Sequence, residues 1–115
     1  MKYTLALLAT LLPSMAVADS LNMIKTFDED TFISLFAYTT DNKDGVHINA
    51  FSTKATQVAI RGDGVPLTTC PGSFCQFTWT KAAMQSRKCV QCELIVTVTE
   101  VDGKSYRIKT EVIRP

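Results

Sequence analysis

The sequence predicts an all-β fold, an antiparallel β-sandwich of six or seven short strands stapled by two disulfides. Three observations favour this class. Apolar and polar residues alternate with a period of two, most clearly over residues 94–99 and 106–112. Turn-forming residues separate such segments at regular spacing along the chain. Four cysteines lie within residues 70–92 of a chain that begins with an export-type leader.

Residues 1–18 have the pattern of a removable signal peptide. Lys2 precedes an apolar stretch over residues 5–12, and residues 16–18 read Ala-Val-Ala, which matches the small-x-small cleavage site. The apolar stretch is shorter than the roughly 20 residues that cross a bilayer. We therefore expect cleavage after residue 18 and a single secreted or periplasmic domain over residues 19–115, with no integral membrane segment.

The composition of the mature part excludes several function classes. Its 97 residues suit one domain with one modest core and no deep chamber between lobes. Removing Lys2 from 12 basic residues leaves 11, against 11 acidic residues, so its formal charge is zero. No overall basic field is available to hold nucleic acid.

Charge is nevertheless distributed unevenly along the mature chain. Residues 19–44 hold two lysines against six acids, a sum of −4, whereas residues 81–115 hold seven basic residues against four acids, a sum of +3. Either the terminal elements lie side by side, or the charges cover two solvated faces, or an acidic patch docks a partner.

Residues 27–38 fit either a helix or a strand. Thr26 with Glu29 three residues later would cap a helix, whereas the aromatic and β-branched content of residues 32–38 favours a strand. We choose the strand, and we expect it to pair with a further strand over residues 46–51 that follows a turn-rich segment.

A hairpin is expected next, from strands over residues 56–60 and 65–69. A four-residue loop, Arg61-Gly62-Asp63-Gly64, would join them and place Ile60 opposite Val65, so that like faces meet.

The segment after this hairpin either changes layer or carries a bulge. Pro66 cannot donate a ladder hydrogen bond, so its strand lies at a sheet edge or just after a bulge. A tight reversal over residues 70–75 would mix the faces of the next strand, 76–79, so the chain crosses to another layer here or carries a bulge. Trp79 is expected in the core. Residues 81–88 are rich in helix formers and predict a short helical crossover.

The segments around Val98 and Tyr106 form the last hairpin. A three-residue loop over residues 101–103 pairs these two residues and keeps the apolar faces together, whereas a two-residue turn would mix the faces. Such a loop is a type I turn followed by a left-handed residue, and Gly103 suits that position because it has no Cβ.

Two of these segments carry a resemblance to a known fold. The run over residues 92–103 followed by Tyr106 resembles the last hairpin of bacterial immunoglobulin-like and PKD-like sandwich domains. Phe77-Thr78-Trp79 resembles their central strand with its buried Trp. The long Cys-to-Cys spacing that antibody domains have around this Trp is missing. The resemblance implies an Ig-like architecture alone, since such folds carry many unrelated functions.

Cys70, Cys75, Cys89 and Cys92 predict two disulfides, because an even number of cysteines in a small exported chain forms bridges. Local pairing, 70 with 75 and 89 with 92, ranks first. Nested pairing, 70 with 92 and 75 with 89, fits an antiparallel ladder and ranks second, and crossed pairing fits none. The spacing also resembles a zinc ribbon, but export favours oxidation, so we expect neither a metal nor another cofactor.

Candidate site residues are few. Arg61-Gly62-Asp63 spells the tripeptide that integrins recognise, and with Gly64 it forms a possible interaction loop, although turn chemistry alone explains these residue types. His47 is the single histidine and is expected at the surface or at an edge. No nucleophile of the Gly-x-Ser-x-Gly type is present, so we predict no catalytic residue.

The expected function is that of an exported binding module. It would contact a protein partner through loops or an edge strand, for example by strand addition. One alternative is an inhibitor or a chaperone-like assembly factor of an envelope or host protein, acting through loop 61–64 or 71–74. The other is a thiol–disulfide oxidoreductase using Cys89 and Cys92, although a strand follows this pair where an activated thiol needs a helix N-terminus.

Overall fold

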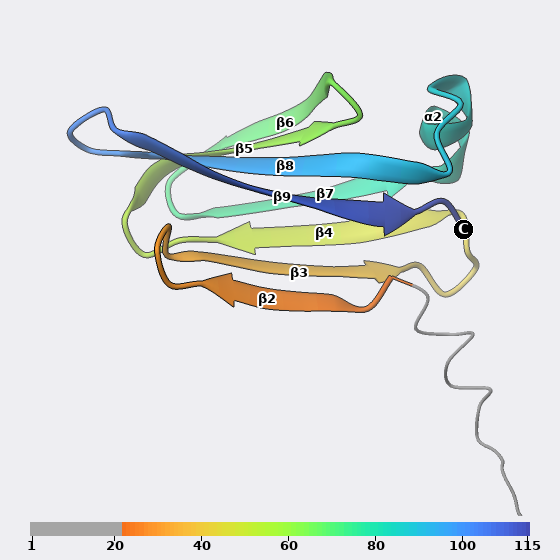
Figure 1. The fold of residues 1–115 in the computed structure, drawn as a ribbon, viewed down its shortest axis with the longest axis horizontal. Helices are drawn as coiled ribbons and strands as arrows, with labels where there is room; N and C mark the ends of the chain where they lie inside the picture. The colour runs from red at the N-terminus through yellow and green to blue at the C-terminus, as the bar shows by residue number, and fades with distance from the viewer. Residues whose placement is uncertain (1–21) are drawn as a thin grey trace, which may run out of the picture.

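The computed structural model describes residues 22–115, so the predicted signal peptide lies outside the described residues. The described chain forms two packed four-stranded antiparallel sheets and one short helix (Figure 1). The strand order is β2-β3-β4-β7 in one sheet and β6-β5-β8-β9 in the other. The all-β sandwich class is confirmed. The elements are β2 (Ile24–Asp28), β3 (Ile33–Thr39), β4 (Gly45–Phe51), β5 (Ala55–Gly62), β6 (Val65–Pro71), β7 (Phe74–Thr80), α2 (Lys81–Ser86), β8 (Gln91–Glu100) and β9 (Ser105–Ile113).

The first sheet contains one strand more than the sequence predicts. The extra strand is β2, which pairs only with β3 at the edge of the sheet. Its sequence, Ile-Lys-Thr-Phe-Asp, is short and mostly exposed, so it has no clean alternation of buried and exposed residues. Of the ambiguous residues 27–38, the first two belong to β2, 29–32 form a turn, and 33–38 lie in the strand β3, which pairs with β4 as expected.

The loop between β5 and β6 is shorter than predicted. Arg61 and Gly62 belong to β5, and only Asp63 and Gly64 form the turn. Both turn residues have a positive φ, 49° and 83°, which is the geometry of two-residue hairpin connections that match the twist of the strands. The four-residue loop was therefore wrong.

The predicted register of this hairpin was also wrong. Ile60 lies opposite Thr68 and not opposite Val65, because the shorter turn places Gly62 opposite Val65 and the register then shifts by one more residue between Ile60 and Arg61. Such a bulge places an extra residue in one strand and removes the parity on which the prediction relied. β6 is an edge strand, as Pro66 indicated.

The chain changes layer between β6 and β7, which is the first of the two predicted alternatives. Cys70 of β6 and Cys75 of β7 form a disulfide, so a covalent link joins the two sheets at this corner. The predicted helical crossover is α2, which ends at Ser86, two residues before the expected end. The Thr80 side chain caps the helix by accepting a hydrogen bond from the backbone N–H of Ala83 (3.1 Å).

The β8–β9 hairpin has the register that the sequence predicts. Val98 pairs with Tyr106. The Gly103 N–H donates to the Glu100 carbonyl (2.9 Å), and Gly103 has a φ of 86°. Both the three-residue loop and the left-handed glycine are therefore confirmed.

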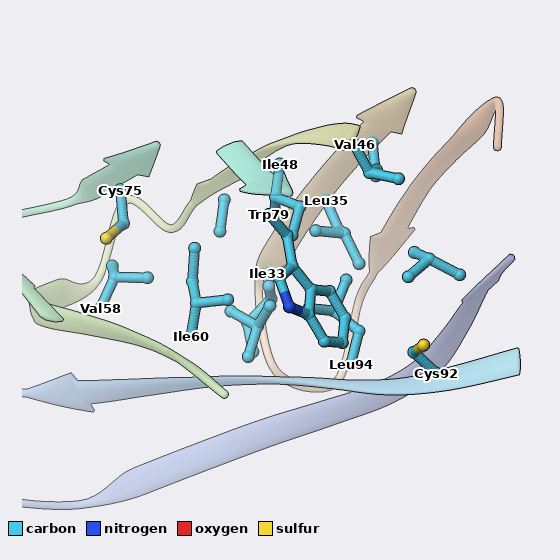
Figure 2. Packing of buried hydrophobic residues seen from close by; sticks show 14 of the residues in the cluster. Ile33, Leu35, Val46, Ile48, Val58, Ile60, Cys75, Trp79, Cys92 and Leu94 are labelled. Atoms are coloured by element: carbon cyan, nitrogen blue, oxygen red, sulfur yellow. The ribbon is translucent and has the colours of Figure 1, made fainter. Parts of the chain in front are cut away.

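Trp79 lies at the centre of the core and is 1% exposed. Figure 2 shows its indole ring between the two sheets, close to Ile33 and Leu94. A Cβ added to Gly62 would lie 2.6 Å from Cζ2 of this ring, so the absence of a side chain at Gly62 lets the indole approach the β5 backbone.

Hydrogen bonds of the Asn22 side chain connect the start of the described chain to its end. Its Nδ2 donates to the carbonyl of Ile113 (2.6 Å) and to Oγ1 of Thr39 (2.9 Å), and its Oδ1 accepts from the Ile113 N–H (2.6 Å). Thr39 lies in β3 and Ile113 in β9, so this buried amide links the two sheets on the side opposite the disulfide corner.

Candidate functional site

A row of phenylalanines crosses the outer face of the sheet β2-β3-β4-β7. Cross-strand pairing places Phe27 beside Ser34, Ser34 beside Phe51, and Phe51 beside Phe74. Phe36 lies two residues beyond Ser34 on the same face of β3, since side chains alternate along a strand. The four rings are 37% to 54% exposed. Large apolar side chains gathered on a solvent face are typical of a contact surface.

Together these rings form what we call the phenylalanine groove, defined as Phe27, Phe36, Phe51 and Phe74 around Ser34. The small Ser34 side chain leaves a hollow of ≈ 490 Å³ that is open along the sheet. Its remaining lining residues are Lys25, Thr26, Leu35 and Asn49. The volume falls within the roughly 300–1,000 Å³ of typical ligand sites, and the lining is mostly apolar.

The outward positions of this sheet carry one charged side chain, Lys25, which lies opposite Phe36. A second cation lies near one end of the groove: the Lys54 Nζ is 3.9 Å from the centroid of the Phe32 ring. Phe32 in turn packs edge-on against Phe27, with ring centroids 6.5 Å apart. The groove is therefore an apolar surface flanked by positive charge.

A polar and aromatic ladder extends the groove along the sheet. Tyr38 packs against Phe36 and His47 with its ring tilted to theirs, and the ring centroids are 5.1 Å apart in both pairs. The His47 Nδ1 lies 2.9 Å from the Thr78 Oγ1. His47 is thus a surface residue on a central strand, and it widens the aromatic face.

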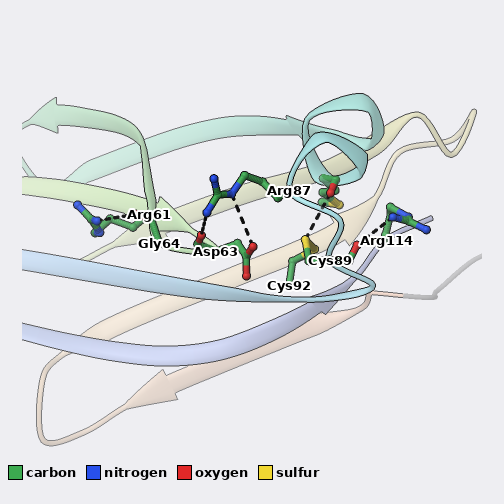
Figure 3. A network of polar contacts seen from close by, with 8 residues as sticks. Arg61, Asp63, Gly64, Arg87, Cys89, Cys92 and Arg114 are labelled. Carbon is green, nitrogen blue, oxygen red and sulfur yellow. Dashed lines mark hydrogen bonds and ion pairs between the residues drawn. A yellow bond between two sulfur atoms is a disulfide. The ribbon is translucent and has the colours of Figure 1, made fainter.

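The predicted interaction loop lies elsewhere and is engaged within the molecule. Arg61 donates to the Gly64 carbonyl (2.8 Å), and Arg87, which follows α2, donates to the Asp63 carbonyl (2.9 Å) (Figure 3). The Arg87 Nε lies 3.7 Å from the Asp63 carboxylate. Arg61 therefore bridges the β5–β6 turn, and Asp63 links this turn to the end of the helix.

The four cysteines pair locally, as the sequence analysis ranked first: Cys70 with Cys75 and Cys89 with Cys92. Figure 2 places Cys75 and Cys92 at opposite ends of the core, so the sulfur atoms do not converge on one ligand set. Among residues 22–115, no group of three or more His, Cys, Asp or Glu side chains is arranged to hold a metal ion.

Cys89 and Cys92 lie in surroundings that do not favour a thiolate. Cys89 follows the C-terminal end of α2, and its Sγ lies 3.6 Å from the Met84 carbonyl oxygen. Carbonyl oxygens at a helix C-terminus disfavour negative charge, whereas activated thiols sit at helix N-termini or beside cations. The Arg114 guanidinium is nearby but donates to the Cys89 carbonyl (3.1 Å).

Acidic residues near the start of the described chain and a basic residue near its end line the same gap. Asp28, Glu29 and Asp30 line a gap of ≈ 620 Å³ between β2 and β9, together with Lys109. The Lys109 Nζ, however, lies 3.8 Å from the carboxylate of Glu93 on its own sheet. The ends of the chain thus lie side by side without an ion pair between them in the described part.

Sequence reasoning missed the phenylalanine groove. In the structure Ile33 and Leu35 of β3 point inward and Phe36 points outward, but apolar residues occupy both phases of this strand, so its alternation gives no signal for the groove. Within residues 22–115, no helix has both the length and the apolar character that a membrane crossing requires.

No protein-family model, curated protein or solved structure matches this chain.

Proposed function

We propose that the protein is an exported binding module whose phenylalanine groove receives bulky apolar side chains of a protein partner. The observation that carries this proposal is the set of four half-exposed rings around Ser34. The two disulfides support an oxidising, extracytoplasmic setting, because such bridges persist outside the cytosol. The proposed contact surface is a sheet face, in place of the loops or edge strand that the sequence favoured.

The area that these rings can still bury limits the free energy that they contribute to binding. A phenylalanine that is about half exposed has roughly 90 Å² left to bury, which contributes about 2 kcal/mol. Four rings together contribute about 8 kcal/mol, against an association cost of roughly 4–15 kcal/mol. The rings therefore provide the core of an interface, and polar contacts around them must add to it.

The shape of the groove favours a polypeptide over a small molecule. Small-molecule sites bury about 70–90% of their ligand in a concave cavity, whereas this groove is open along the sheet over four strands. An extended segment with large side chains at alternate positions can follow such a surface and cover several rings at once.

Selection of displayed random peptides on the immobilised protein tests this proposal. Enriched peptides are expected to bind a variant with Phe36→Ser and Phe51→Ser at least tenfold more weakly. A matched control, Val90→Ser with Val101→Ser, removes two other exposed apolar side chains that flank β8 and do not line the groove, and it should bind as the wild type does. Unchanged melting temperatures of both variants would show that the fold is retained.

Two outcomes would contradict the proposal. Peptides that bind the Phe36→Ser and Phe51→Ser variant as tightly as the wild type would place the contact surface outside the groove. Failure to enrich any peptide on the wild-type protein would show that the groove does not receive polypeptide segments.

A further inference from the structure

We infer that the segment bound in the phenylalanine groove is acidic: it carries a carboxylate, beside its bulky apolar residues, that pairs with Lys25. This inference rests on the function proposed above and adds the chemical class of the partner. Lys25 lines the groove and makes no ion pair with another described residue. Its ammonium is therefore available at the rim of an apolar surface.

The alternation of β2 keeps Asp28 off the outward face. Lys25 and Phe27 point outward, whereas Asp28, with Glu29 and Asp30 of the following turn, lines the gap between β2 and β9, which shares Thr26 and Phe27 with the groove. No carboxylate occupies an outward position on β2, β3, β4 or β7. Lys54, above Phe32, adds a second positive charge at the hairpin end of the groove. A partner complementary to this face carries negative charge.

The same charges argue against the two other occupants of an apolar sheet face. Two copies of the chain meeting through their grooves would bring Lys25 of each onto a face whose outward strand positions carry no carboxylate to pair with it. A polyanion such as nucleic acid needs several phosphate contacts to bind, and this face offers two lysines.

The test compares three displayed peptide libraries that differ in charge alone. Each has Leu, Phe and Trp at alternate positions, with the intervening positions drawn from Asp and Glu, from Asn and Gln, or from Lys and Arg. Binders of the wild-type protein are expected mainly from the acidic library. On a Lys25→Glu variant, which reverses the rim charge, binders should come from the basic library instead.

Selected acidic peptides then provide a quantitative readout. Lys25→Ala should weaken their binding about two- to fivefold, as expected for a solvent-exposed ion pair, and Lys25→Glu should weaken it more than tenfold. Arg107→Glu, which changes the net charge equally on an exposed position of the other sheet, should leave binding unchanged. Increasing salt should weaken wild-type binding and leave binding to Lys25→Ala less affected.

The outcomes separate this inference from the proposed function. Equal enrichment from the acidic and the amide library, with binding lost in Phe36→Ser and Phe51→Ser, would keep the groove and overturn the acidic partner. No enrichment from any library would overturn both. Self-association seen by sedimentation, and lost in the phenylalanine variant, would assign the groove to a second copy of the chain.

Discussion

Replacing Gly62 by alanine is expected to destabilise the protein by about 1–3 kcal/mol, the usual cost of forcing an extra methyl group into a packed core. The new Cβ would lie 2.6 Å from Cζ2 and 2.7 Å from Cη2 of Trp79, and 2.7 Å from Cδ1 of Leu67. Trp79 is 1% exposed, so its ring has no solvent to move into. Gly62 itself is paired on both sides, with Val65 and Leu94, so the backbone is held as well.

Urea denaturation followed by far-UV circular dichroism measures this cost, and a Trp79→Phe background assigns it to the indole. Phenylalanine lacks the outer ring atoms that make two of the three close contacts, so Gly62→Ala should cost less than half as much there. Gly103→Ala serves as the control. Its Cβ would enter open space, but its φ of 86° is left-handed, so it should cost about 1 kcal/mol in both backgrounds.

Two results would refute this reasoning about Gly62. One is a loss of stability below about 0.5 kcal/mol, which would mean that the core yields to the methyl group without strain. The other is an equal loss in the wild-type and Trp79→Phe backgrounds, which would show that the indole is not what the new Cβ meets.

Two further predictions concern the links between the sheets. Asn22→Ala should cost about 1–3 kcal/mol, because a buried amide with three hydrogen bonds is lost, and it should speed hydrogen exchange of the Ile113 amide; unchanged exchange would contradict the role of Asn22. Replacing both Cys70 and Cys75 by alanine should cost about 2 kcal/mol, the entropy of closing this short loop in the unfolded chain. A change in the urea midpoint too small to separate from the wild type would show that the corner needs no covalent link.

The two hairpins show what the sequence can and cannot determine. In β8–β9 the ladder of paired residues is uninterrupted. The alternation of apolar residues on both strands and the loop length therefore allow one register, with Val98 opposite Tyr106. In β5–β6 the same reasoning failed, because the turn is two residues shorter than expected and the bulge after Ile60 shifts the partner by one residue more. A bulge leaves the apolar pattern of each strand intact while it changes how the two strands align, so pattern alone does not reveal it.

The groove lies beyond sequence reasoning for a different reason. Its rings come from four strands, and their proximity depends on three successive cross-strand registers between Phe27 and Phe74. In β3 both faces are rich in apolar residues, so alternation does not tell which face is buried until the partner sheet is placed. Local pairing of cysteines, by contrast, needed only short separations and was predictable.

The contrast between the two sheets is the strongest argument that the groove has a purpose beyond strand formation. The sheet β6-β5-β8-β9 contains no phenylalanine, and the outward positions of β8 and β9 carry residues such as Thr97, Arg107 and Lys109. Residues of that kind form stable strands and keep the surface hydrated. The outer face of the first sheet could be built in the same way, yet it exposes four rings that raise the risk of aggregation. On the strands of the second sheet only Ile113 is a large apolar residue of comparable exposure, so the gathering of four rings on the first sheet supports the proposed partner.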